Sequence, residues 1–125
     1  MKAAARLFFT LAIAYVILGM ALGMQMGMTQ NHGEMPTHAH LMLVGWVTSA
    51  LVAYFYHQFP AANASPLALV HFALHLAGSA VMVVSLWQIY GGNTSFEPGA
   101  GIGAIGFLLG MLVFAYLSLR EVWKA

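Results

Sequence analysis

The stretch that decides how this chain folds is THAHLMLVGW, residues 37–46. It opens an apolar segment long enough to cross a lipid bilayer and places two histidines at the mouth of that segment. Ionisable side chains are costly inside a membrane, so those that occur there usually have a function. Helical residues two apart point about 200° from each other, so His38 and His40 project from opposite sides of a helix. We therefore expect them to serve two neighbouring sites and not to chelate one ion.

The composition assigns the chain to the integral membrane proteins. Of its 125 residues, 62% are hydrophobic and only 6% are charged, which does not suit a soluble domain with a polar surface. Each of four apolar stretches contains the ~20 residues that a helix needs to span ~30 Å of hydrocarbon. We expect one all-α domain, residues 1–125, with four transmembrane helices in up-down-up-down order. The expected helices cover residues 5–28, 37–58, 66–90 and 100–122.

The cationic residues predict the orientation of these helices. All of them, Lys2, Arg6, Arg120 and Lys124, lie near the two chain ends. Four crossings bring both ends to one side of the membrane, and the positive-inside rule makes that side cytoplasmic. We expect a multi-pass protein of the bacterial inner membrane with both termini in the cytoplasm. The net charge of +1 and the lack of a basic run do not favour nucleic-acid binding.

The first apolar stretch has a second interpretation, as a cleaved signal peptide. Lys2 and Arg6 would form its positive region, and the small residues at 21–23 would form its cleavage site. The apolar run is longer than that of a usual signal peptide. A first membrane helix is therefore the favoured interpretation.

The chain contains no cysteine, which narrows its chemistry. Disulfides, thiolate metal sites, covalently attached c-type haem and a cysteine nucleophile are all excluded. Neither a Gly-x-Ser-x-Gly elbow nor a phosphate-binding loop occurs. Chemistry must therefore use histidine, methionine, tyrosine, the acids or the backbone, and the sequence assigns no enzyme class.

The six histidines divide by their expected depth in the membrane. His71 and His75 are four residues apart on one helix face, so they could hold one ion, relay protons or make structural hydrogen bonds. They lie roughly 8 Å and roughly 14 Å from the start of the third helix, whereas His40 lies at the opposite surface. We therefore do not expect one metal to join His40 to His71. His57 and His32 are expected in the interfacial and aqueous regions.

Residues 37–46 also carry a resemblance to a known family. Within a frame of four crossings, they resemble the haem-ligand region of the second helix in the haem-copper oxidase subunit I superfamily. They look most like its small stand-alone four-helix relatives, whose motif reads His-Ala-His-Leu-Asn-Leu-x-Gly-Trp. The chain departs from this motif at Met42, where the relatives have Asn. The dipeptide His71-Phe72 also has a counterpart in them.

This resemblance implies a homotrimer of twelve helices that binds haem b non-covalently at the interfaces between protomers. It implies His38, His40 and His71 as haem-binding residues, with His38 of one protomer approaching His40 of its neighbour. Iron held between two imidazoles would transfer electrons, because no coordination position stays open for oxygen. A redox partner is then expected on the extracytoplasmic side. Oxygen reduction is not expected, since the outer loops lack arginines for haem propionates and no three-histidine copper site is evident.

Two other functions remain open at this point. The first is extracytoplasmic copper(I) handling by Met24, Met26 and Met28 with His32, because thioethers and imidazoles together select Cu(I). The second is a structural or assembly role, in which the methionines are packing residues.

Small residues at four-residue spacing mark the first and the last helix as helices that pack closely against neighbours. They are Gly19, Gly23 and Gly27 in the first, and two pairs in the last, Gly99 with Gly103 and Gly106 with Gly110.

Overall fold

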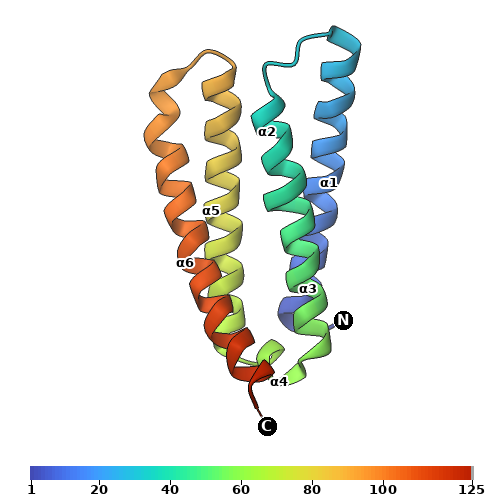
Figure 1. Cartoon of the computed structure of the whole chain (residues 1–125), viewed down its shortest axis with the longest axis vertical. Helices are drawn as coiled ribbons and strands as arrows, with labels where there is room; N and C mark the ends of the chain where they lie inside the picture. The colour runs from blue at the N-terminus through green and yellow to red at the C-terminus, as the bar shows by residue number, and fades with distance from the viewer. Residues whose placement is uncertain (125) are drawn as a thin grey trace.

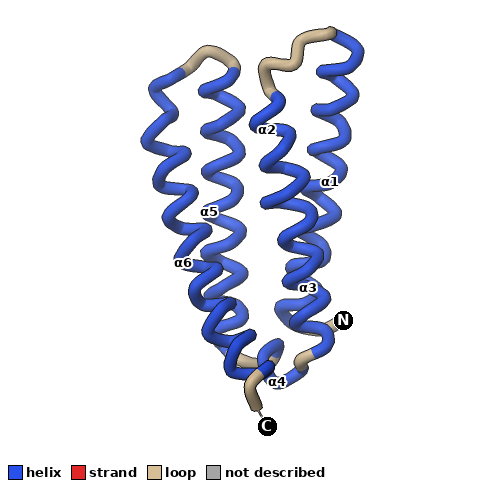
Figure 2. Tube along the Cα trace, viewed as in Figure 1, coloured by secondary structure: helices blue, strands red, loops and turns tan. Residues whose placement is uncertain are grey.

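The computed structural model describes residues 1–124, so Ala125, the last residue of the predicted domain, lies outside the described residues. All regular structure within residues 1–124 is helical, and loops occupy only the short connections and chain ends (Figure 2). The elements are α1 (Ala3–Thr29), α2 (Met35–His40), the π-helical η1 (Leu41–Val47), α3 (Thr48–Gln58), α4 (Pro60–Asn63), α5 (Pro66–Tyr90), the 3₁₀ turn η2 (Thr94–Phe96) and α6 (Glu97–Val122).

These elements form two antiparallel hairpins (Figure 1). In the first hairpin, α1 lies beside the rod formed by α2, η1 and α3. In the second, α5 lies beside α6. The two hairpins converge where α4 joins them and where both chain termini lie, which we call the terminus end (Figure 1). At the opposite end, which we call the loop end, residues 30–34 and 91–93 connect the helices.

Four helical segments are long and apolar enough to cross a membrane, which supports a multi-pass membrane protein. The first three agree with the predicted helices to within two residues at each boundary. The fourth helix was predicted from residue 100, but α6 begins at Glu97. The difference arises because Pro98 occupies its first turn, where a missing N–H group costs no hydrogen bond. The segments are Ala3–Thr29, Met35–Gln58, Pro66–Tyr90 and Thr94–Val122.

Glycines hold the second hairpin together by allowing the backbones of α5 and α6 to touch. A Cβ atom on Gly78 would lie 2.3 Å from the backbone nitrogen of Phe107. A Cβ atom on Gly103 would lie 2.5 Å from the backbone nitrogen of Met82. Neither backbone can yield without separating the helices, so this pair requires residues without side chains. The close packing predicted for the last helix is confirmed at these positions.

A different contact holds the first hairpin together and links it to the second. Gly45 in η1 receives the ring of Tyr15, and a Cβ atom there would lie 2.4 Å from the ring carbon Cγ. The hydroxyl of Tyr15 then shares a hydrogen bond of 2.6 Å with the hydroxyl of Ser79 in α5. Both side chains are buried, so the two hairpins are joined by a polar contact within the apolar interior.

The seven-residue π-helical segment η1 follows His40 directly. Thr48 is the residue that follows η1, and its hydroxyl donates a hydrogen bond of 2.7 Å to the carbonyl oxygen of Leu43 within the segment. A continuous helix was predicted over residues 37–58, because this stretch is long enough and apolar enough to span a bilayer. Segments of π-helix are frequently found at functional sites, which draws attention to the residues just before this one.

The best-sealed part of the core lies at the terminus end. There Phe8, Tyr56 and Leu117 are fully buried. The side chain of Asn63 in α4 accepts a hydrogen bond from the backbone N–H of Ala5 and also donates one to a backbone carbonyl near the N-terminus, both at about 3 Å. The start of α1, which would otherwise expose unpaired N–H groups, is thereby fastened to the connection between the hairpins.

Candidate functional site

His38 is positioned by helix α1. Its Nδ1 atom lies 2.8 Å from the carbonyl oxygen of Gly19. Its ring lies over Gly23, where a Cβ atom would come within 2.9 Å of the ring carbon Cε1. The two glycines thus form a recess for one imidazole. A carbonyl oxygen only accepts hydrogen bonds, so Nδ1 carries a proton, and in the neutral ring the lone pair is on Nε2.

His40 is positioned by its own helix. Its Nδ1 atom lies 2.8 Å from the carbonyl oxygen of Pro36, one turn earlier in α2. The same reasoning places the proton on Nδ1 and the lone pair on Nε2. Both histidines are half-buried, so neither ring is sealed inside the protomer.

The two histidines therefore share one chemical arrangement. Metal-bound histidines almost always donate their other ring N–H to a carbonyl, a carboxylate or water, which selects the tautomer and the ring orientation. His38 and His40 each have such a carbonyl partner. No hydrogen bond within residues 1–124 occupies either Nε2 atom. Both imidazoles therefore fit the coordination of a haem iron as neutral Nε2 ligands.

The acid nearest in sequence to this pair is engaged in a local contact. The hydroxyl of Thr37 donates a hydrogen bond of 2.6 Å to Oε2 of Glu34 at the start of α2. Thr37 is buried and lies one residue before His38. The contact closes the first turn of the helix and so stabilises the backbone that carries both histidines.

His71 and His75 form a second histidine pair, on α5 toward the terminus end. Their ring centroids lie 5.5 Å apart, which confirms that they share one helix face. Nδ1 of His71 and the hydroxyl of Tyr56 share a hydrogen bond of 3.0 Å. Nε2 of His75 and the hydroxyl of Ser49 share one of 2.9 Å. Each ring is therefore tied to α3 by one nitrogen.

Aromatic rings seal this second pair completely. The ring of Phe8 lies 4.7 Å from His71 and 5.0 Å from His75, between centroids. Phe114 stacks on His71 at 5.2 Å, and Phe107 lies 4.7 Å from His75. Both histidines have no exposed surface, and their remaining nitrogens, Nε2 of His71 and Nδ1 of His75, have no partner in the described part of the chain. A ligand could reach them only by displacing these rings.

The structure does not bring the two histidine pairs together. Within the described residues, no three side chains of the metal-binding types His, Asp and Glu converge. His38 contacts α1, whereas His71 contacts α3 and the aromatic rings. One protomer therefore holds two half-buried histidines with separate partners and one sealed pair.

The predicted copper ligands do not converge in one protomer either. Met24 and Met28 lie on the exposed side of α1, with 65% and 78% of their surface accessible, whereas Met26 is 4% accessible. The alternation follows from helical geometry, because residues two apart lie on opposite sides. His32 is exposed at the same end, and His57 is exposed at the terminus end.

The partners of the second pair were missed in the sequence analysis. Ser49 and Tyr56 lie seven residues apart and so share a face of α3, just as His71 and His75 share a face of α5. The available signal was that each of these two apolar stretches carries two polar residues on one helix face. It could be recognised only by assuming that these two helices are neighbours.

Comparison with known proteins adds no relative: no protein-family model, no curated protein and no solved structure matches the chain.

Proposed function

We propose that this protein binds haem b in the bacterial inner membrane, with His38 and His40 as the axial ligands. The single observation that carries the proposal is the shared state of the two rings. Each donates its Nδ1 proton to a backbone carbonyl at 2.8 Å, which leaves Nε2 as a lone-pair donor on a partly accessible ring. Iron held by two imidazoles would supply one-electron transfer.

The chain's own contribution is to orient the ligands before anything binds. The carbonyl oxygen of Gly19 prevents rotation of the His38 ring, and Gly23 provides the space in which that ring lies. The carbonyl oxygen of Pro36 does the same for His40. Because these contacts already exist in the folded protomer, binding does not have to restrict either side chain further.

The two ligands of one iron are proposed to come from different protomers. His38 and His40 lie on one helix about 200° apart, so they cannot face the same side of it. A neighbouring copy would supply the missing imidazole for each, and three copies would close the arrangement into a ring. This is the homotrimer implied by the resemblance to the small oxidase-like proteins. The positive-inside rule places the termini in the cytoplasm, and the loop end outside.

His71 is not included in this ligand set. Its ring is fully buried against Phe8 and Phe114, and one nitrogen is engaged by Tyr56. The proposal therefore narrows the predicted haem ligands from His38, His40 and His71 to the first two.

The test is a reduced-minus-oxidised spectrum and a pyridine haemochrome assay on detergent-purified protein from haem-replete cells. The wild type is expected to show a haem b signal, and His38→Ala and His40→Ala are each expected to remove most of it. His57→Ala is the matched control, because His57 is an exposed histidine at the terminus end and its loss should leave the signal unchanged.

Two results would overturn the proposal. One is a haem signal that survives in both variants while circular dichroism shows that they fold. The other is a colourless wild-type protein that binds copper(I) and loses it in Met24→Leu and Met28→Leu, which would favour the copper function.

A further inference from the structure

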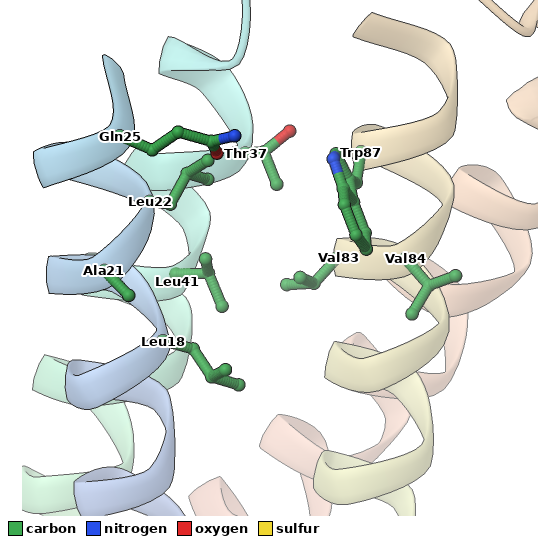
Figure 3. A pocket seen from close by; sticks show the side chains of 9 residues that line it. All are labelled: Leu18, Ala21, Leu22, Gln25, Thr37, Leu41, Val83, Val84 and Trp87. Carbon is green, nitrogen blue, oxygen red and sulfur yellow. The ribbon is translucent and has the colours of Figure 1, made fainter. Parts of the chain in front are cut away.

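An elongated cavity of about 450 Å³ lies between the two hairpins, in the half of the molecule toward the loop end (Figure 3). One wall comes from α1 and the start of the α2–η1 rod, and the other comes from α5. Cavities that bind small molecules typically measure about 300–1,000 Å³. The lining residues are Leu18, Ala21, Leu22, Gln25, Thr37, Leu41, Val83, Val84 and Trp87.

The polar and apolar side chains of this cavity are separated along its length. Gln25, Thr37 and Trp87 place an amide, a hydroxyl and an indole nitrogen at one level, toward the loop end (Figure 3). Below them, Leu18 and Val84 represent a wall of purely aliphatic side chains (Figure 3). The cavity is therefore amphiphilic, with its polar end toward the membrane surface.

A second hollow, of about 320 Å³, continues the polar end. It shares Leu22, Gln25 and Trp87 with the first cavity, so the two adjoin. Its other lining groups include the polar side chains of Thr29, Asn31, Glu34 and Tyr90. The pair forms an apolar chamber beneath a polar one.

The charges of the polar chamber restrict what it can hold. Glu34 is the only residue among those lining either hollow that carries a formal charge, and neither hollow is lined by lysine or arginine. A phosphate or carboxylate head would meet a carboxylate with no cation to offset the repulsion. The carboxylate of Glu34 already accepts a hydrogen bond of 2.6 Å from Thr37. The side chains of Gln25, Trp87 and Asn31 are neutral, and they suit an uncharged head whose hydroxyl groups can exchange hydrogen bonds with them.

We propose that this cavity binds a single-chain amphiphile with an uncharged, hydroxyl-bearing head, of the kind represented by a monoacylglycerol. The head occupies the polar chamber beside Gln25 and Trp87. The chain lies along the aliphatic wall between α1 and α5. This site uses neither His38 nor His40, so it is independent of the proposed haem binding.

Trp87 lines the site and is 60% exposed, so it reports on contact with both the cavity and the surrounding lipid, which differ in whether quenching saturates. A protein with Trp46→Phe and Trp123→Phe retains Trp87 as its only tryptophan. It is reconstituted in nanodiscs of saturated phosphatidylcholine and titrated with a monoacylglycerol brominated on its chain, because bromine quenches indole fluorescence on contact. The proposal predicts quenching that saturates at a low mole fraction of the probe.

Two comparisons separate a site from general contact with lipid. A second single-tryptophan protein retains Trp123, which is 81% exposed near the C-terminus, and should show only a linear, unsaturated response. A brominated fatty acid of the same chain length, ionised at neutral pH, should quench Trp87 far more weakly at equal mole fraction.

Substitutions then locate the occupant. Ala21→Phe fills the apolar chamber and should abolish saturable quenching, and Val83→Phe does the same from the opposite wall if the first variant does not fold. Gln25→Leu removes one hydrogen-bonding group and should raise the half-saturating mole fraction about fivefold.

Three results would overturn the proposal. The first is a linear response that is the same for brominated monoacylglycerol and brominated phosphatidylcholine. The second is saturable quenching that persists in both phenylalanine variants. The third is no quenching of Trp87 by any brominated lipid, which would show that protein, such as a second copy of the chain, covers the cavity.

Discussion

The two halves of this bundle each hold a pair of histidines, and they treat them in opposite ways. Toward the loop end, His38 and His40 are half-buried, and each ring is bonded to a backbone carbonyl. Toward the terminus end, His71 and His75 are fully buried, and each ring is bonded to a hydroxyl. The same residue type in the same kind of apolar segment thus stays partly accessible in one half and is sealed in the other.

The difference comes from what surrounds the rings. In the loop half, the glycines on α1 leave a recess for the His38 ring, which stays half-buried. In the terminus half, phenylalanines from α1 and α6 occupy the space around His71. A membrane histidine is therefore best judged by the partner of its second nitrogen and by the residues over its free edge, and depth in the membrane is a poorer guide.

The largest effect should come from breaking the backbone contact that supports the sealed half. In Gly78→Leu, the new side chain would meet the backbone of α6, since even a Cβ atom lies 2.3 Å from the nitrogen of Phe107. The second hairpin should fail to close, and folded protein should be lost from size-exclusion chromatography in detergent. Gly101→Leu is the control, because nothing lies within 4 Å of a Cβ atom there and the protein should fold normally.

The next largest effect should be a difference in stability between two variants, each of which places an aspartate at one of the two histidine pairs. His71→Asp puts a carboxyl group among aromatic rings, and a charge inside a membrane protein costs about 3 kcal/mol. His40→Asp, on a half-buried position, should cost less than about 1 kcal/mol. Denaturant titration of both proteins in the same micelle measures the difference. Equal losses would mean that the two halves are equally closed.

The recess under His38 can be filled without touching the ligand itself. In Gly23→Ala, the added methyl group lies 2.9 Å from the imidazole and should rotate it away from its carbonyl partner. We expect haem affinity to fall about 10- to 100-fold, as for other groups that orient a metal ligand. Gly27→Ala, on the same helix with nothing within 4 Å, should bind haem as the wild type does. Haem titration of the apoprotein measures both affinities.

The smallest expected effect is on the hydrogen bond that ties the sealed pair to α3. Tyr56→Phe leaves Nδ1 of His71 without its partner and should lower the free energy of unfolding by about 1 kcal/mol. Tyr54→Phe removes an exposed hydroxyl from the same helix and should change stability by less than that. A loss in Tyr54→Phe as large as that in Tyr56→Phe would contradict a specific role for this bond.

Much of the fold could be predicted, because membrane helices are encoded locally. The apolar length of each stretch, with the prolines that flank the second and open the third, was enough to place three helices to within two residues. The shared face of His71 and His75 followed from their spacing alone. The π-helical segment η1 was not predictable, since residues 41–47 are as apolar and as uninterrupted as an α-helix would be.

The candidate site was predictable only in part. The sequence indicated His38 and His40 as a pair that faces two directions, but it could not show which ring nitrogen of each carries the proton. That depends on carbonyl oxygens from Gly19, nineteen residues away, and from Pro36. The burial of the Met26 side chain and the cavity lined by Trp87 likewise depend on where the second hairpin lies.

By itself, the sequence determined that this chain forms four apolar helices and which of their faces carry histidine, because helix formation in a membrane depends on local composition and a period of 3.6 residues. Only the tertiary structure decided which histidines are open and which are sealed. That outcome depends on glycines and phenylalanines from other helices meeting the rings, and such contacts form only once the helices are packed side by side.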